Sequence, residues 1–369
     1  RELCLGFRPI TIETRGRMGQ SEISAARTLL FLSCLVWIFG FTPVLYAQSN
    51  FYQGKSIRVV RGGQAGDLYD LWARLIASHL GKHIPGNPSI VVQNMPGAGS
   101  VIAANYVYGL AKPDGLTIGS INPAIYMDQL VARKEVQFDW AKFVWIGTPE
   151  QTDFLLFIRS DNSNKNVDDL RKAAEPPKCG STGTGSPQYH IPRLLEGTLT
   201  VKFNLITGYQ GAPDIDLALE RGEIHCRTIT IAAYSGREPF LTWGKNGFLR
   251  PLVQTGRKRD PSLPNVPTFY ELMDRYNTPE AGRRLATVVL APSEFGRPMV
   301  TTPGVPAERV KILREAWNKT LKDPELLAEA KKRDWLVGPV AGEELAALAK
   351  DVVAQPPEVI QRLKKLLGE

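Results

Sequence analysis

The sequence predicts an α/β protein with two domains, in which each domain is a mostly parallel sheet flanked by helices. Apolar runs typical of strands alternate with amphipathic segments typical of helices, and short glycine-rich turns join them. This order of strand, turn and helix starts at residue 55 and starts again at residue 177. The chain has 369 residues, enough for two hydrophobic cores, and its 43% hydrophobic and 22% charged content is typical of globular proteins.

The N-terminal segment predicts export rather than a part of the fold. Arginines precede the apolar run TLLFLSCLVWIFGF at residues 28–41, and a short segment ending in Ala47 follows it. This pattern predicts a signal peptide cleaved after Ala47 and a periplasmic location, with residues 1–17, before the first Met, as an upstream extension. An uncleaved anchor is disfavoured because Pro43 interrupts the segment, and lipidation is disfavoured because Cys34 lies inside the run.

The first domain is predicted from three strands and two helices joined by tight turns. The segment 70–80 continues an apolar stripe at helical spacing and ends at Gly81, and Asp114-Gly115 forms a turn before the third strand. Strands that alternate with helices in this way form a parallel sheet with a ligand crevice at the carboxyl ends of its strands. The predicted elements are strands 55–61, 89–93 and 116–121, a helix at 70–80, and a helix with Val101, Ala104, Tyr108 and Ala111 on one face.

The second domain repeats the pattern after a crossing at 143–158, where two apolar runs surround Gly147. An apolar, β-branched stretch at 285–291 is interpreted as the crossing back, and helices follow it. Asp323-Pro324 is a typical start for one of these helices, with the aspartate as N-cap. The predicted elements are strands 177–180, 199–207, 224–232 and 249–255 and helices 188–195, 215–221, 306–321, 343–353 and 358–367. The predicted division is 1–47 (leader), 48–153 (first lobe), 154–283 (second lobe) and 284–369 (return to the first lobe and C-terminal helices).

Two glycine-rich turns are candidate ligand cradles, at 62–66 and 180–186. Each precedes a helix, so each can present free backbone N–H groups to an anion or a polar ligand. The second turn adds four hydroxyl residues. An ordinary connection that needs glycine remains the alternative for both. Neither turn has the Gly-Lys-Ser/Thr ending of a phosphate-binding loop, and residues 97–99 lack a dinucleotide fingerprint, so no cofactor is expected.

Catalytic and metal-site patterns are weak. The chain has no G-x-S-x-G motif and no prominent carboxylate pair, and His190 fits a polar core or a pocket edge better than a general base. His79 and His83 are four residues apart, but Gly81 separates them and no third ligand is near, so no metal is expected. Enzymatic activity is therefore disfavoured.

Charge and cysteine content narrow the possibilities further. The net charge of +8 is modest, and no dense Lys/Arg block is interleaved with aromatic residues, which argues against nucleic acid as a partner. Cys179 and Cys226 lie beyond the leader. In an oxidising compartment they either form a disulfide or remain two buried thiols at the ends of neighbouring strands.

Taken together, the turns resemble those of the extracytoplasmic solute-binding proteins of the tripartite tricarboxylate transporter group, the TctC or Bug family. The order and spacing of the motifs carry the resemblance, which covers nearly the whole chain beyond the leader. The matching motifs are Gly66-x-x-Tyr69-Asp70-x-x-Ala73-Arg74, residues 93–99 with Asp114-Gly115, residues 180–186, Gly208-Tyr209-x-Gly211, Gly222-Glu223, Asn265-Val-Pro-Thr268, and Arg297-Pro298 with residues 303–306.

The resemblance implies a two-lobed, hinged periplasmic binding protein of the type II (Venus-flytrap) class, without catalysis and without cofactor. It implies a monomer that binds a small carboxylate between its lobes, largely through backbone amides, and delivers it to a membrane permease. The hinges are expected near Phe154 and Val288. The alternative is a sensor of the same fold that signals to a membrane receptor. The expected ligand-binding residues are Ala65, Gly66, Asp67, Tyr69, Asp70, Ser181, Thr182, Gly183, Thr184, Gly185, Ser186, Tyr209 and Gly211.

Three positions qualify the resemblance. Asp70 more often caps or neutralises a helix start than it contacts a ligand. Asp67 and Leu68 stand where the family pattern has glycine, and a negative charge at a carboxylate-binding helix start is unfavourable. Asp67 therefore points away, or the ligand is neutral or carries a cation. Cys226 also stands where related sequences often have glycine.

Overall fold

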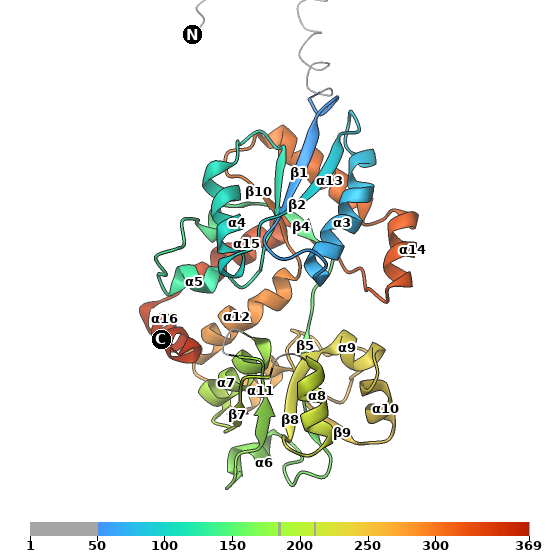
Figure 1. Cartoon of the computed structure of the whole chain (residues 1–369). Helices are drawn as coiled ribbons and strands as arrows, with labels where there is room; N and C mark the ends of the chain where they lie inside the picture. The colour runs from blue at the N-terminus through green and yellow to red at the C-terminus, as the bar shows by residue number, and fades with distance from the viewer. Residues whose placement is uncertain (1–50, 184–185, 210–211, 369) are drawn as a thin grey trace, which may run out of the picture. The chain divides into compact units, whose positions relative to one another are not determined.

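The computed structural model describes residues 51–183, 186–209 and 212–368 (Figure 1). The chain divides into residues up to Phe51 and one compact unit, Tyr52–Glu369. The predicted signal peptide lies outside the described residues. Within the described part of the chain, no helix has the length and the apolar character needed to cross a membrane.

The first lobe is built on a six-stranded sheet with the order β11-β4-β10-β3-β1-β2. The three predicted strands of this lobe form a parallel set, in which β1 pairs with both β2 and β3. The remaining strands join from later parts of the chain and pair antiparallel. The strands are β1 (Ser56–Arg61), β2 (Ser89–Asn94), β3 (Thr117–Ser120), β4 (Val144–Thr148), β10 (Met299–Thr301) and β11 (Val340–Ala341).

Helices from both ends of the described chain pack on this sheet. The helix α3 contacts β1 and β2, while α13 contacts both α3 and β4, and α15 packs on β4. The predicted second helix is a short α-helix that continues as a π-helical turn. The helices are α3 (Leu68–Leu80), α4 (Val101–Asn105) with the π-turn Tyr106–Leu110, α5 (Tyr126–Leu130), α13 (Ala307–Thr320), α14 (Pro324–Lys332) and α15 (Gly342–Val353). The last helix, α16 (Pro357–Leu367), packs on helices of the second lobe instead.

The second lobe has a five-stranded sheet with the order β7-β6-β8-β5-β9. Here β6 pairs parallel with β7 and β8, whereas β5 pairs antiparallel with β8 and β9. The strands are β5 (Phe154–Arg159), β6 (Lys178–Gly180), β7 (Asn204–Ile206), β8 (Cys226–Thr230) and β9 (Leu249–Gln254). The helices are α6 (Val167–Lys172), α7 (Pro187–Leu199), α8 (Ala212–Glu220), α9 (Ile231–Gly236), α10 (Phe240–Lys245), α11 (Phe269–Arg275) and α12 (Glu280–Phe295).

The α/β fold class is confirmed, but both sheets are mixed rather than mostly parallel. The reason is the path of the chain. β5 enters the second sheet directly after β4 leaves the first, and β10 returns to the first sheet after α12. Strands that enter a sheet from the other lobe need not follow the parallel order that strand–helix–strand units impose.

The stretch 285–291 is the middle of α12, not an extended segment. Leu285, Val288 and Leu290 are all nearly inaccessible, because α12 packs against α7, α15 and α16. Because neighbouring helices cover this part of α12, residues 285–291 are almost continuously apolar, and a short apolar run does not distinguish a buried helix from a strand. The chain returns to the first sheet after Phe295, at Gly296.

Two strand predictions were too long in the second lobe. The predicted strand 199–207 is only β7, because α7 continues to Leu199 and Thr200 adopts a left-handed backbone (φ 57°) that ends it. The predicted strand 224–232 ends at Thr230, whose side chain caps α9. Other predicted features hold: Asp323 caps α14 through the backbone N–H of Glu325, with Pro324 as its first residue.

Cys179 and Cys226 form a disulfide, so the first of the two open alternatives is the one observed. The two cysteines are register partners on the parallel strands β6 and β8. Both are fully buried within the core of the second lobe. The covalent link therefore fixes β6, and the loop that follows it, to the centre of the sheet.

Candidate functional site

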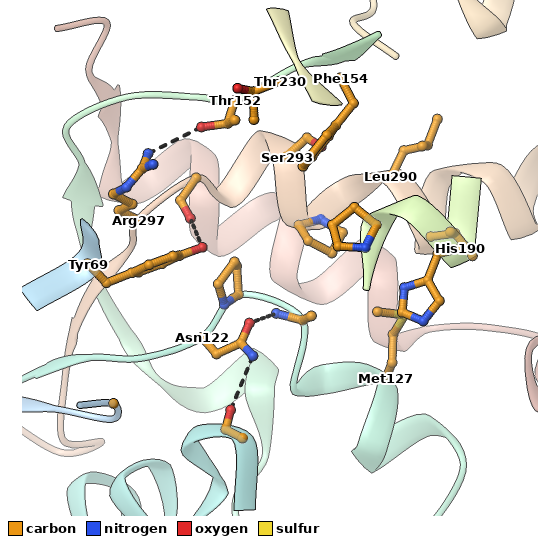
Figure 2. A pocket seen from close by; sticks show the side chains of 18 of the residues that line it. Tyr69, Asn122, Met127, Thr152, Phe154, His190, Thr230, Leu290, Ser293 and Arg297 are labelled. Atoms are coloured by element: carbon orange, nitrogen blue, oxygen red, sulfur yellow. Dashed lines mark hydrogen bonds between the residues drawn. The ribbon is translucent and has the colours of Figure 1, made fainter. Parts of the chain in front are cut away.

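The chain crosses between the lobes twice, at residues 149–153 between β4 and β5 and at residues 296–298 between α12 and β10. A cavity of about 580 Å³ lies where the carboxyl ends of β1 and β3 meet these two crossings. Its walls come from the loops after β1 and β3, from the segment between β4 and β5, from the first turn of α7 and from the last turns of α12. Figure 2 shows its side chains converging from these separate elements. This is the place at which open α/β sheets bind ligands.

One end of the cavity is cationic and aromatic. The guanidinium carbon of Arg61 lies 4.9 Å from the centre of the Tyr69 ring, and that of Arg297 lies 5.2 Å from the same centre. Tyr69 donates a hydrogen bond of 3.4 Å to the carbonyl of Gly296. Both arginines are more than nine-tenths buried. The two buried guanidinium groups therefore lie close to the same aromatic ring.

Each of these arginines is only partly satisfied. Arg61 forms an ion pair of 2.8 Å with Asp67 and donates to the Ser120 carbonyl at 3.4 Å. Its Nε–H, like that of Arg297, is buried and has no acceptor within the described chain. A buried donor without a partner is costly. The parts of both guanidinium groups that line the cavity are favourable partners for an anion.

The second arginine is held by the crossing segments. Arg297 pairs with Glu150 and donates to the Thr152 hydroxyl at 3.2 Å. Its backbone N–H donates to the Thr148 hydroxyl at 2.9 Å. Arg297 and Thr152 are therefore positioned together, as Figure 2 shows. An acid bound here would contact both segments that connect the lobes.

Burial shifts the titration of these groups. Burial raises the pKa of Tyr69, although the charges of Arg297 and Arg61 oppose this, so the phenol stays protonated and can donate a hydrogen bond. Burial lowers the pKa of Arg297, and the nearby Tyr69 opposes this shift. The polar end thus combines the donors of two arginines with the carboxylates that pair with them.

The other end of the cavity is largely apolar. Met127 and Leu290 face it together with His190, away from Tyr69 and Arg297 (Figure 2). The cavity is also lined by Phe154, Ile191, Val289, the prolines Pro123, Pro187 and Pro292, and the polar residues Asn122, Thr230 and Ser293. The cavity is therefore amphipathic, with an apolar end and a polar end that contains two arginines.

The first predicted loop contributes part of this wall. Asp67 and Tyr69 line the cavity, whereas Ala65, Gly66 and Asp70 do not. Asp67 does not point away: its side chain accepts from the Asp70 N–H at 2.7 Å, caps α3 and pairs with Arg61. The sequence predicts that the Asp67 carboxylate is unfavourable at a carboxylate-binding helix start. In the structure this carboxylate is the N-cap of α3.

Asp70 has the structural role weighed against ligand contact. Its carboxylate is buried and accepts from the Gly66 N–H at 2.8 Å, from Arg74 Nε at 2.9 Å and from Asn94 Nδ2 at 2.9 Å. Burial on its own would raise the pKa of Asp70, but these hydrogen bonds lower it. All its contacts stabilise the loop between β1 and α3.

The described residues of the second predicted loop lie beside the cavity rather than in its wall. The Ser181 and Ser186 hydroxyls lie 3.0 Å apart, and Ser186 donates to the Gly183 carbonyl at 2.8 Å. These residues, with Thr182 and Tyr209, are not among the lining residues, but Pro187, His190 and Ile191 directly after them are. Thr184, Gly185 and Gly211 lie outside the described residues.

Sequence reasoning missed most of the polar wall. Arg61 is the last residue of β1, Asn122 follows β3, and Thr152 lies between β4 and β5. Arg297 did appear in the Arg-Pro motif, but without a role. Arg61 could have been singled out from the sequence, because it ends an apolar strand. A charged residue is rarely buried unless it is paired.

The two histidines predicted not to hold a metal lie beside an ion-pair network. His79 lies near Asp323 and Glu325, a geometry that could hold a cation. Lys82 occupies that place, with its Nζ 2.6 Å from Asp323 and 2.7 Å from Glu325, and His83 lies 2.9 Å from Asp323. The ammonium group supplies the positive charge, and the network ties α3 to the start of α14.

Two α/β lobes joined by two crossings, with an amphipathic cavity at those crossings, define a two-lobed solute-binding protein. The chain belongs to the tripartite tricarboxylate transporter family receptors (TctC), whose family model matches residues 72–365. Members of this family are solute-binding receptors and not enzymes. The predicted family is therefore confirmed.

Individual relatives are distant. The chain is 26% identical over 322 residues to a "UPF0065 protein in gbd 5'region" of Cupriavidus necator, covering 86% of this chain and 90% of the relative. A TctC solute-binding protein from Polaromonas superposes with a TM-score of 0.65 at 22% identity, covering 86% and 99% of the two chains. Rpa4515 of R. palustris, solved with adipate, gives a TM-score of 0.54 at 21% identity, covering 85% and 98%.

Proposed function

We propose that this protein is a periplasmic receptor that captures a small carboxylate and delivers it to the membrane permease of a tripartite transporter. The observation that carries the proposal is the pair of largely buried arginines that line the cavity around Tyr69. A carboxylate has the charge and the lone pairs to satisfy such donors. The adipate found in a structural neighbour supports the same chemistry.

Capture would follow from the position of Arg297 and Thr152. Both lie at the crossings between the lobes, so a carboxylate held there contacts the segments about which two-lobed receptors close. Tyr69 comes from the first lobe and His190 from the second, so the ligand would join the two. Closure would remove water and strengthen the charge-assisted hydrogen bonds.

Calorimetry on the purified protein tests this function with a panel of small monocarboxylates and dicarboxylates. Arg297→Gln should weaken binding of the best acid by about 30-fold or more, because a charged hydrogen-bonding partner contributes about 2 kcal/mol or more. Arg275→Gln is the matched control, since Arg275 is exposed and pairs with Asp168 away from the cavity. The proposal fails if no acid binds the folded protein, or if both variants bind like the original.

Export is part of the same proposal. The apolar run before Ala47 would direct the chain across the inner membrane and be removed there. Sequencing the N-terminus of the protein recovered from a periplasmic fraction should give Gln48 as the first residue. Recovery of the uncut chain in the membrane fraction would instead indicate an anchor.

A further inference from the structure

The start of α3 is already occupied by carboxylates of the chain itself. The Asp67 carboxylate accepts the Asp70 N–H at 2.7 Å and the Arg61 guanidinium at 2.8 Å. The Gly66 N–H donates to Asp70 at 2.8 Å. A helix N-terminus with a glycine-rich turn and a nearby arginine is a favourable place for an anion. Asp67 makes the contacts that a ligand carboxylate would make there.

The charges around the polar end are already balanced among the described residues, so this end offers no free cation to a second carboxylate. Asp67 pairs with Arg61, and Glu150 pairs with Arg297, so both arginines are partly neutralised. What remains for a ligand is the part of each guanidinium group that lines the cavity near the Tyr69 ring. Two guanidinium groups near one ring suit the two oxygens of a single carboxylate.

The far end of the cavity offers little to a second carboxylate. Met127, Ile191 and Leu290 line it, and His190 is the one titratable side chain among the described residues of that wall. Moving an ionised carboxylate from water to such an environment is strongly unfavourable unless it is paired. An aliphatic or aromatic group there gains from burial instead.

We propose, on the basis of the function above, that the ligand is a monocarboxylate with an apolar body, and that Asp67 is the residue that excludes a second carboxylate. The carboxylate of the ligand contacts Arg297 and Arg61 beside the Tyr69 ring, and its apolar body lies along Met127, Ile191 and Leu290. Asp67 fills the remaining anion subsite at the start of α3. A dicarboxylate must either displace Asp67 or bury a charge among apolar side chains.

Hexanoate and adipate test the proposal, because they have equal chain length and differ by one carboxylate. Calorimetry on the original protein should show hexanoate binding about tenfold or more tighter than adipate. In Asp67→Asn, the ratio should shift toward adipate by about tenfold or more, because the amide keeps the cap on α3 while the Arg61 charge becomes free. Thermal unfolding confirms that the variant is folded.

Asp274→Asn is the control for loss of one negative charge, since Asp274 is exposed on α11 and does not line the cavity. It should leave the hexanoate-to-adipate ratio unchanged. Three outcomes separate the claims. Tighter binding of adipate than hexanoate by the original protein overturns this inference but supports the proposed function. An unchanged ratio in Asp67→Asn overturns the role of Asp67. No binding of any acid by the folded protein overturns the proposed function itself.

Discussion

Asp67 and Asp70 are three residues apart and have different structural roles. Asp67 is partly exposed in the cavity and joins the cap of α3 to Arg61, while Asp70 is buried beneath it and holds the loop. These contacts agree with the structural role that the sequence favours for Asp70 over contact with a ligand. The unfavourable charge predicted for Asp67 is offset locally by an arginine that the sequence pattern did not connect to it.

Asp70→Asn tests the structural role of the buried carboxylate. The lowered pKa of Asp70 means that its contribution to stability is present above the unfolded pKa and is lost as the pH falls toward the folded value. The variant should lose about 1–3 kcal/mol of unfolding free energy at pH 7, because donors from Gly66, Arg74 and Asn94 lose a charged acceptor. Urea denaturation at pH 7 and near pH 3 should show the loss shrinking with acid. An equal loss at both pH values would contradict this assignment.

At the scale of elements, the two crossings are the part of the fold that matters most for binding. The Thr152 N–H donates to the Ser293 carbonyl at 3.1 Å, and Gln151 donates to the Glu294 carbonyl at 3.1 Å, so the crossings hold each other. Gly296 has φ of 60°, and a Cβ at this position would collide with the Glu150 carbonyl. The crossings approach closely only because glycine stands there.

Asp153 makes this junction sensitive to pH. Burial raises the pKa of Asp153 to about 6, and the negative charges of Glu294 and Asp260 add to the shift. Glu294 is itself paired with Arg257 at 2.8 Å. Because the folded pKa lies above the unfolded one, the native state holds an extra proton between about pH 4 and 6. The protein should therefore lose stability as the pH rises through this range.

Asp153→Asn removes the buried charge and checks this reasoning. The variant should be more stable than the original protein by about 1–3 kcal/mol at pH 7.5, and the gain should disappear near pH 4, where the original side chain is protonated. Chemical denaturation at the two pH values measures the difference. A gain of equal size at both would show that amide packing, not charge, is responsible.

At the scale of the whole molecule, the disulfide is the one covalent link among the described residues between distant parts of the chain. It joins cysteines 47 residues apart in sequence at the centre of the second sheet. Replacing both by alanine should lower the unfolding free energy by about 2–4 kcal/mol, through the loop-closure entropy of the unfolded chain. Guanidinium denaturation with and without reductant tests it: reductant should destabilise the original protein and leave the double variant unaffected.

The sequence by itself determined the elements whose signals are local. The strand, turn and helix at β1 and α3, the Asp323 cap of α14, and the family motifs all depend on residues close in the chain. Local backbone preference and one-sided hydrophobic patterning are sufficient for these. Cys179 and Cys226 stayed undecided, because a disulfide depends on geometry that spacing alone does not give.

Only the tertiary structure decided the direction of the strands contributed across the lobes, the helical state of α12 and the composition of the cavity wall. Residues 285–291 of α12 are almost continuously apolar because other helices cover them, and a short apolar run fits a strand as well as a buried helix. Arg61 and Arg297 come from distant parts of the chain and meet only around Tyr69. Asp67 pairs with Arg61 and Glu150 pairs with Arg297, so each arginine is neutralised by a carboxylate. This charge balance depends on the folded chain bringing the four side chains together.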